Sequence, residues 1–301
     1  MTWRGRAVLV VVGLLVGLLI GEVVFRTAVP TRDLSAVELW RAQCWRTDAS
    51  GYREQPPSTW RVDSRRVLVL GDSFAAGLGI CDPRDTFPWQ LAQRLERHSP
   101  GAFRVNVAAK PGIDTRDELE ILRSLPQQPH VLVLAYFGND IDSAARAAGL
   151  PDPPAFAFYS DLSPFPRALV TTSRIANYAY WSLSRLADYS PILQHYQDVW
   201  ARDDVVKAHL RELEGFFLPG VPLVVVVFPY MPNPPIARYT RTVSEHMRSR
   251  GAAVINVEEL ISDLPIPARM VAPNDLHASV EVHHRVGAAL AEAITQLKKR
   301  H

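Results

Sequence analysis

The chain has 301 residues, of which 48% are hydrophobic and 21% are charged, a composition typical of a globular protein and not of a disordered, collagen-like or coiled-coil chain. The 33 basic and 31 acidic residues leave a formal net charge of +2, so the charge balance does not favour nucleic acid as a partner, which usually needs a clustered basic face. Two cysteines are too few for a disulfide scaffold or a four-thiolate zinc site. The length allows two domains or one large α/β domain.

The N-terminal region contains a long apolar run. It extends from Ala7 to Phe25 and is interrupted only by Glu22. As a helix this run would span roughly 28 Å, close to the hydrocarbon thickness of a bilayer. Arg4 and Arg6 precede it, as in the basic region of a signal sequence.

Three interpretations of the apolar run remain open: an uncleaved anchor, a cleaved signal peptide and a buried helix of a soluble protein. Cleavage after Ala28 would place Arg26 at position −3, where signal peptidase needs a small residue. We therefore favour a signal anchor over residues 1–25. The protein would then be a single-pass protein of the cell membrane, with a juxtamembrane segment at 26–64 and an extracytoplasmic domain at 65–301.

An alternation of strands and helices is predicted for the remainder. Short apolar, β-branched runs predict buried strands at 66–70, 104–109, 131–136, 222–228 and 252–257. Helical spacing of apolar residues predicts helices at 86–97, 118–125 and 280–299. Continuous apolar strands separated by helices indicate an α/β fold with a five-stranded parallel sheet covered on both faces.

An insertion of about residues 141–215 separates the third and fourth predicted strands, far longer than the usual connection. It contains a stretch rich in proline and aromatic residues and two predicted helices, at 174–189 and 205–217. Two interpretations remain open for this segment. It is either a decorated crossover or a lid or substrate-binding wall beside the site.

Small and polar residues follow the first three predicted strands. Ser73 ends a Gly-Asp-Ser motif after the first strand, Gly112 follows the second, and Asn139 lies within a Gly-Asn-Asp motif after the third. The carboxyl ends of parallel strands meet at one edge of a sheet. Ser73 is therefore a candidate nucleophile, and the Ser73 N–H, the Gly112 N–H and the Asn139 amide form a candidate oxyanion hole. Taken singly, each is better explained as a turn residue.

Asp275 and His277 stand just before the predicted C-terminal helix. A carboxylate two residues before a histidine can fold back and hold its Nδ1–H, which leaves Nε2 free to act as a base towards Ser73. The reference pKa of histidine, about 6.5, suits this role. His283 and His284 are alternative bases, but the helical pattern places them on the faces of the last helix. By itself, a pair such as Asp275 and His277 is also common in surface loops.

Taken together, the four signals resemble the SGNH, or GDSL-type, hydrolase family over residues 65–301, in the order Ser73, Gly112, Asn139 and His277. The stretch GDSFAAGLGICDPRDTFPWQLAQRL is similar to a bacterial, membrane-anchored branch. The resemblance implies a flavodoxin-like, three-layer α/β/α fold and hydrolysis of ester-linked acyl groups. It implies neither a metal nor an organic cofactor.

The chain departs from the pattern of that family near the base. The common Asp-x-x-His spacing would put the acid at Asn274, whereas Asp275 forms an Asp-x-His motif, a spacing similar to that of the alginate-acetylation branch of the superfamily. We assign Asp275 as the orienting acid. The usual proline after the histidine is Ala278 here.

The expected activity is that of a serine esterase acting on O-acyl esters through an acyl-serine. Acetyl is the expected acyl group, and an acylated carbohydrate of the cell surface or a related ester is the expected substrate. One alternative is an O-acyltransferase that passes the acyl group to a sugar hydroxyl and works with a membrane acyltransferase as partner. Another is a catalytically silent binding domain on the same fold, which the complete set of site residues disfavours.

The two cysteines have two interpretations. In an oxidising compartment Cys44 and Cys81 can pair, which would tie the juxtamembrane segment to the loop after Ser73. Alternatively they are unrelated thiols, one of them buried as a small hydrophobic residue. The separation of their backbones decides between the two.

Overall fold

The computed structural model of the chain describes residues 2–28, 40, 44–57, 61–154, 162–183, 190–231, 238–272 and 275–298. It contains two compact units. The smaller unit comprises residues 1–43 and 155–188, and the larger unit comprises residues 44–154 and 189–301.

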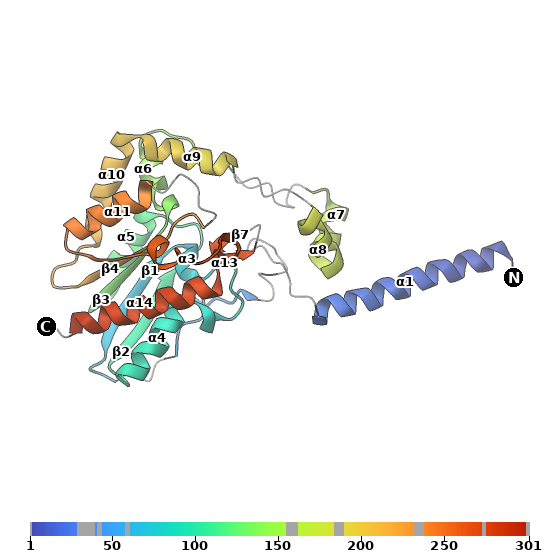
Figure 1. Cartoon of the computed structure of the whole chain (residues 1–301), viewed down its shortest axis with the longest axis horizontal. Coiled ribbons are helices and arrows are strands. Elements are labelled where there is room, and N and C mark those ends of the chain that lie inside the picture. The colour runs from blue at the N-terminus through green and yellow to red at the C-terminus, as the bar shows by residue number, and fades with distance from the viewer. Residues whose placement is uncertain are drawn as a thin grey trace. The chain divides into compact units, whose positions relative to one another are not determined.

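The larger unit is built on a parallel sheet in the order β2-β1-β3-β4-β5, shown in Figure 1. The strands are β1 (Arg65–Gly71), β2 (Phe103–Ala109), β3 (Val131–Tyr136), β4 (Leu223–Val227) and β5 (Ala253–Asn256). Gly71 pairs with Ala109 of β2 and with Ala135 of β3, so these three strands end at the same edge. The predicted five-stranded parallel sheet is confirmed.

Helices cover the two faces of this sheet. On one face Leu91 of α4 (Phe87–His98) and Val286 of α14 (Val280–Lys298) join a buried cluster with Val69 of β1. Figure 1 shows α5 (Thr115–Ser124), α10 (Asp203–Leu213) and α11 (Arg238–Ser249) on the other side of the sheet. Because valine and leucine alternate along buried strands, each face contributes an apolar surface to its own helix layer.

Several elements were not predicted from the sequence. The longer ones are α7 (Pro164–Thr172), α9 (Ser190–Ala201) and α11. In α9 and α11 the polar residues outnumber the apolar residues that these helices bury. The short ones are α3 (Ser73–Ala76), η1 (Pro83–Asp85), η2 (Gly138–Ile141), α6 (Asp142–Ala147), η4 (Glu214–Phe216), α12 (Val257–Leu260), α13 (Ile266–Arg269), β6 (Met270–Ala272) and β7 (Asp275–Ala278). Strands β6 and β7 pair antiparallel and are too short to show a period in the sequence.

The smaller unit contains three helices: α1 (Trp3–Ala28), α7 (Pro164–Thr172) and α8 (Arg174–Leu183). The most apolar 18-residue window of helix α1, within Trp3–Thr27, has a mean hydropathy of 2.8. By length and composition this helix could cross a membrane, and a signal sequence would have the same properties. The predicted helix at 174–189 coincides with α8, and its last residues, 184–189, lie outside the described residues.

Within the larger unit, residues 44–57 contact the outer edge of β2. The Gln55 side chain donates a hydrogen bond to the Val107 carbonyl (2.9 Å) and accepts one from the Val107 N–H (2.7 Å), as a neighbouring strand would. Nearby, the sulfur atoms of Cys44 and Cys81 form a disulfide, with Cα atoms 4.7 Å apart. This segment therefore covers an edge strand that would otherwise expose unpaired backbone groups.

We expect the disulfide to stabilise the larger unit. Its cysteines are separated by 37 residues, and closing a loop of this size lowers the entropy of the unfolded chain enough to contribute about 4 kcal/mol. Replacing Cys44 and Cys81 by serine together should lower the free energy of unfolding by an amount of this order, measured by denaturant unfolding. Two reactive thiols in the unreduced, denatured parent protein would contradict the bridge.

Candidate active site

Ser73 lies at the first position of the short helix α3, directly after β1. Its neighbour Asp72 caps this helix, because Asp72 Oδ1 accepts a hydrogen bond from the Phe74 N–H at 2.9 Å. The Ser73 hydroxyl lies 3.3 Å from Asp72 Oδ2. The turn thus holds the serine at the carboxyl end of the strand, and the residue is 8% exposed.

Gly71 allows this sharp turn between strand and helix. A Cβ atom at Gly71 would lie 2.8 Å from the Cβ of Ala75 and 2.9 Å from the carbonyl oxygen of Ala135. Any larger residue would therefore push α3 away from β1 or β1 away from β3. The close packing of three backbone segments at Gly71 determines where Ser73 stands.

His277 reaches Ser73 from the β6–β7 hairpin. Its Nε2 lies 3.0 Å from the Ser73 hydroxyl oxygen, and its Nδ1 lies 2.6 Å from Asp275 Oδ1. The same Asp275 oxygen also accepts the backbone N–H of His277 at 3.1 Å, so the Asp-x-His spacing folds back on itself. The structure brings together Ser73, His277 and Asp275, whereas Asn274 lies outside the described residues.

The surroundings of His277 raise its pKa above the ordinary value of 6.5. Burial alone would lower it, but the charge of Asp275 and its hydrogen bond to the ring, with a further contribution from the charge of Asp72, outweigh that effect. A raised pKa means that the ring holds a proton firmly once it has received one. Such a histidine is a stronger base than a free imidazole.

The two alternative bases on the last helix, His283 and His284, have hydrogen-bond partners other than Ser73. His283 Nδ1 accepts a hydrogen bond from the Phe87 N–H at 3.1 Å, and burial lowers the pKa of His283 to about 3. His284 Nε2 lies 3.4 Å from Asp85 Oδ1. Neither imidazole has a hydrogen bond to Ser73, so His277 alone of these three contacts it.

Asn139 lies in η2 after β3, and Gly112 lies in the loop after β2; both follow strands that end at the same edge of the sheet as β1. The side-chain amide of Asn139 is hydrogen-bonded to the Asp72 carboxyl group, and its Oδ1 is buried without a hydrogen-bond partner among the described residues. Gly112 has a φ of +79°, a left-handed conformation that favours glycine. A Cβ there would meet nothing within 4 Å, which leaves open space above this residue.

Two aromatic residues contact the Gly138-Asn139 backbone: Trp200 from the insertion and Tyr230 from the segment after β4. The indole Nε1 of Trp200, on α9, donates a hydrogen bond to the Gly138 carbonyl at 3.2 Å. A Cβ at Gly138 would lie only 3.0 Å from the ring of Tyr230. Sequence reasoning missed Trp200, because an aromatic residue on an amphipathic helix is indistinguishable from an ordinary core residue.

Arg53 supports the loop on the other side of Ser73. Its buried guanidinium donates to the carbonyls of Gly77 (2.7 Å) and Cys81 (3.0 Å) and also to those of Ala76 and Ile80. Burial lowers the pKa of Arg53 to about 10, although the charges of Asp82 and Glu54 oppose this. No signal in the sequence points to Arg53, whose four acceptors are backbone atoms more than 20 positions away.

Three carboxyl groups near the carboxyl ends of the strands are fully buried: Asp72 after β1, Asp140 after β3 and Glu118 on α5. Burial raises the pKa of Glu118 well above its ordinary value, and the charges of Asp72, Asp114 and Asp117 add to this effect. Burial, followed by the charges of Glu118 and Asp72, likewise raises the pKa of Asp140, and burial also raises that of Asp72. Among the described residues, no group of three or more His, Cys, Asp or Glu side chains is arranged to hold a metal ion.

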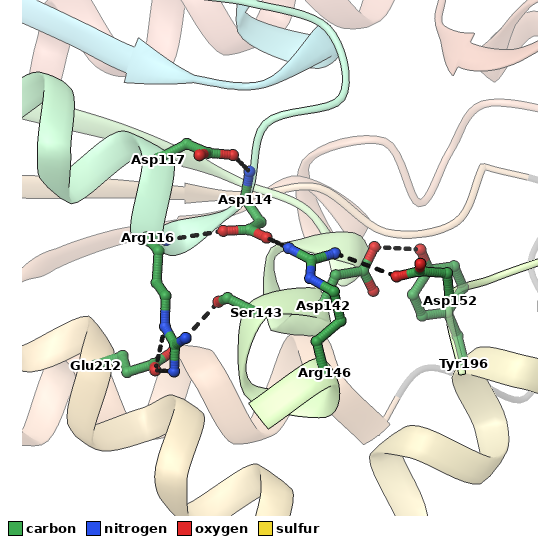
Figure 2. Close-up of polar contacts among 9 residues, drawn as sticks. All are labelled: Asp114, Arg116, Asp117, Asp142, Ser143, Arg146, Asp152, Tyr196 and Glu212. Atoms are coloured by element: carbon green, nitrogen blue, oxygen red, sulfur yellow. Dashed lines mark hydrogen bonds and ion pairs between the residues drawn. The ribbon is translucent and has the colours of Figure 1, made fainter. Parts of the chain in front are cut away.

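A second polar network, drawn in Figure 2, connects the Gly112 loop to the insertion. Asp114 caps α5 by accepting the Arg116 N–H at 2.9 Å, and it also pairs with Arg146 of α6. Asp142 accepts the hydroxyl of Tyr196 on α9 at 3.1 Å. Burial raises the pKa of Asp142 to about 7, against the opposing effect of the Tyr196 hydrogen bond.

Comparisons with known proteins place these features in a family. The GDSL-like Lipase/Acylhydrolase family matches residues 69–285. No curated protein matches the chain.

Among solved structures, the chain is similar to three hydrolases. The acetyl xylan esterase Axe2 from Geobacillus stearothermophilus is 16% identical with a TM-score of 0.46, and the match covers 79% of this chain and 96% of that one. The lipase Lip_vut3 from a goat rumen metagenome is 15% identical with a TM-score of 0.44, covering 76% and 97%. AlinE4, an SGNH-hydrolase family esterase, is 18% identical with a TM-score of 0.37, covering 79% and 98%.

We expect Asp142 to make stability depend on pH near neutrality. Its folded pKa of about 7 exceeds the ordinary 3.8, so folding favours the protonated form, and the associated stability is complete below pH 4 and lost as pH rises through 7. The loss should be on the order of 2–4 kcal/mol. Asp142→Asn, which keeps an acceptor for Tyr196, should remove the contribution of Asp142 in denaturant unfolding between pH 5 and 8, while the contributions of Glu118 and Asp140 remain.

The matched control for this prediction is Asp152→Asn, because Asp152 is exposed and pairs with the same Arg146. It should retain the pH dependence of the parent protein. If Asp142→Asn and the parent lost stability in parallel as pH rose, the assignment to Asp142 would be wrong.

Proposed function

We propose that this chain, which belongs to the GDSL-like lipase/acylhydrolase family and is a carboxylic ester hydrolase, cleaves O-acyl esters through an acyl intermediate on Ser73. The observation that carries the proposal is the continuous hydrogen-bonded line from Asp275 through His277 to Ser73, with separations of 2.6 and 3.0 Å. This is the geometry that activates a serine hydroxyl by a neighbouring base and orients that base by an acid.

In the first half of the reaction, His277 Nε2 takes the proton of the Ser73 hydroxyl as its oxygen attacks the ester carbonyl. The protonated His277 then gives that proton to the departing alcohol, and the acyl group remains on Ser73. Asp275 stabilises the imidazolium that exists between these two transfers. In the second half, His277 activates a water molecule, which releases the acid and regenerates the serine.

Negative charge develops on the carbonyl oxygen in both halves. We propose that the N–H groups of Ser73 and Gly112 and the side-chain amide of Asn139 stabilise this oxyanion. The open space above Gly112 and the position of Asn139 beside Asp72 support this role. The indole of Trp200 supports it indirectly, because it holds the carbonyl of the residue before Asn139.

We further propose that residues 1–25 anchor the protein in the cell membrane as a single span, that residues 26–64 are a juxtamembrane segment and that residues 65–301, with the insertion at 141–215, form an extracytoplasmic hydrolase domain. The length and hydropathy of α1 support the anchor. The disulfide between Cys44 and Cys81 supports an oxidising compartment. In that compartment, acetyl esters of surface carbohydrates are the substrates that we propose.

The test of the catalytic proposal is the hydrolysis of an activated acetyl ester, with and without an oligosaccharide acceptor. The parent protein should release acetate in both cases, and Ser73→Ala should lose activity by a factor on the order of 10⁴ or more while remaining folded. Accumulation of an acetylated oligosaccharide in place of acetate would establish an O-acyltransferase instead. Near-full activity of Ser73→Ala would overturn the proposal for both reactions.

We expect the activity to increase with pH through a midpoint above 6.5, because the base must be neutral and the surroundings of His277 raise its pKa above that value. Asp275→Asn removes the charge that raises this pKa but leaves the burial that lowers it. The midpoint of kcat/KM should therefore fall, and kcat should decrease by a factor on the order of 10³–10⁴.

The control for the pH experiment is Asp85→Asn, which removes a carboxylate from His284 and not from His277. Its pH profile should coincide with that of the parent protein. An unchanged midpoint in Asp275→Asn would show that Asp275 does not set the pKa of the base.

A further inference from the structure

Glu22 interrupts the apolar run of α1, and its contacts show why a charge is tolerated there. Its carboxylate accepts hydrogen bonds from the Ser173 hydroxyl (2.8 Å), the Arg174 N–H (2.8 Å) and the Ile175 N–H (3.3 Å). It also pairs with Arg26, one turn further along α1, at 3.0 Å. The carboxylate of the apolar helix thus satisfies the first backbone donors of α8.

Apolar contacts surround this polar link. Gly21 leaves room for the side chain of Ile175, whose Cδ1 would lie 3.1 Å from a Cβ at Gly21. The ring of Phe25 meets the ring of Tyr178 edge to face, with centroids 5.5 Å apart. The last two turns of α1 and the first two turns of α8 therefore form one packed interface within the smaller unit.

Helices α7 and α8 hold together as a hairpin on this interface. The buried side chain of Asn177, on α8, donates a hydrogen bond to the carbonyl of Val170, on α7, at 3.2 Å. On α7, Phe165 is 79% exposed and Leu169 is 49% exposed. These two residues are four positions apart and so share one face of the helix.

We propose that α7 and α8 form a membrane-bound hairpin, with Phe165 and Leu169 inserted into the lipid beside α1 and with Glu22 holding the hairpin to the anchor. The proposal rests on the membrane location proposed above. The most apolar window of α1 has no residue buried within the protein. Helix α8 packs against α1, and α7 packs against α8. A bilayer that surrounds α1 would therefore also reach this hairpin, so we propose that lipid contacts the exposed face of α7.

The charges of the hairpin favour a lipid surface over a second protein. Residues 162–183 contain Arg167 and Arg174 and no acidic residue. These two basic residues suit anionic phospholipid headgroups at a membrane surface. The half-buried Tyr178 belongs to the residue class that is enriched at this depth.

The test places a nitroxide label on the full-length protein in vesicles of phosphatidylcholine and phosphatidylglycerol. Single cysteines replace Phe165 or Leu169, and Glu120→Cys, on an exposed position of α5 in the larger unit, is the aqueous control. The parent chain, which lacks an introduced cysteine, is treated with the same label and gives the background signal. Power-saturation EPR should show that the labels at 165 and 169 are accessible to oxygen and protected from a water-soluble nickel chelate. The label at 120 should be accessible to the nickel chelate and less accessible to oxygen.

Substitutions of Glu22 test the link between the helices. Glu22→Ala should expose the label at 169 to the nickel chelate at least several-fold more than in the parent, while the protein stays in alkali-washed membranes and its activity on a soluble ester is unchanged. Glu22→Gln, which keeps an acceptor oxygen for α8, should restore most of the protection. A structural role that did not involve the hairpin would leave the label at 169 unmoved.

The outcomes separate this inference from the proposals on which it rests. Labels at 165 and 169 as accessible to nickel as the label at 120 would overturn the hairpin, while retention in washed membranes would leave the anchor standing. Strong dipolar broadening between labels would show a second copy of the chain on α7 and overturn lipid as the occupant. Cleavage and release of the protein from membranes would overturn both the anchor and the hairpin, and leave the esterase reaction unaffected.

Discussion

The hydrogen bond between His277 and Ser73 joins two residues that are 204 positions apart, and the rest of the larger unit is arranged so that it can form. Ser73 is fixed by the meeting of β1, α3 and β3 at Gly71, where no Cβ atom fits. His277 is fixed by a short antiparallel hairpin, β6–β7, that stands outside the main sheet. A displacement of either support by about 1 Å would lengthen the bond beyond the range in which a proton is readily transferred.

The same edge of the sheet concentrates acidic groups. Asp72, Glu118 and Asp140 are all fully buried there, and their mutual repulsion adds to the cost of burial in raising their pKa values. Of these three acids, Asp72 contributes to the raised pKa of His277, after the larger effects of the charge and hydrogen bond of Asp275. Asp72 therefore links the buried acids at the strand ends to the base of the site.

The insertion between β3 and β4 divides its helices between two tasks. Helix α9 contributes Trp200 and Tyr196 to the loop and helix that follow β3, and α10 packs beside α5 and α6. Helices α7 and α8 belong to the smaller unit with α1. One continuous segment of the chain thus reinforces the site and also contacts the apolar N-terminal helix.

The sequence by itself determined the parallel sheet and identified Ser73, Gly112, Asn139, Asp275 and His277 as candidates. It could do so because buried strands are continuous apolar runs, and because the residues after such strands occupy the same edge of a sheet. These signals are local, so they are readable without knowing the path of the chain.

Only the tertiary structure decided which distant groups meet. Arg53 binds backbone carbonyls, Trp200 binds the Gly138 carbonyl, and Glu22 binds the first turn of α8. Backbone N–H and carbonyl groups have the same chemistry at nearly every residue, so these partners leave no mark in the sequence. A helical period likewise shows which face of a helix is apolar but not what that face packs against, and this depends on how the whole chain folds.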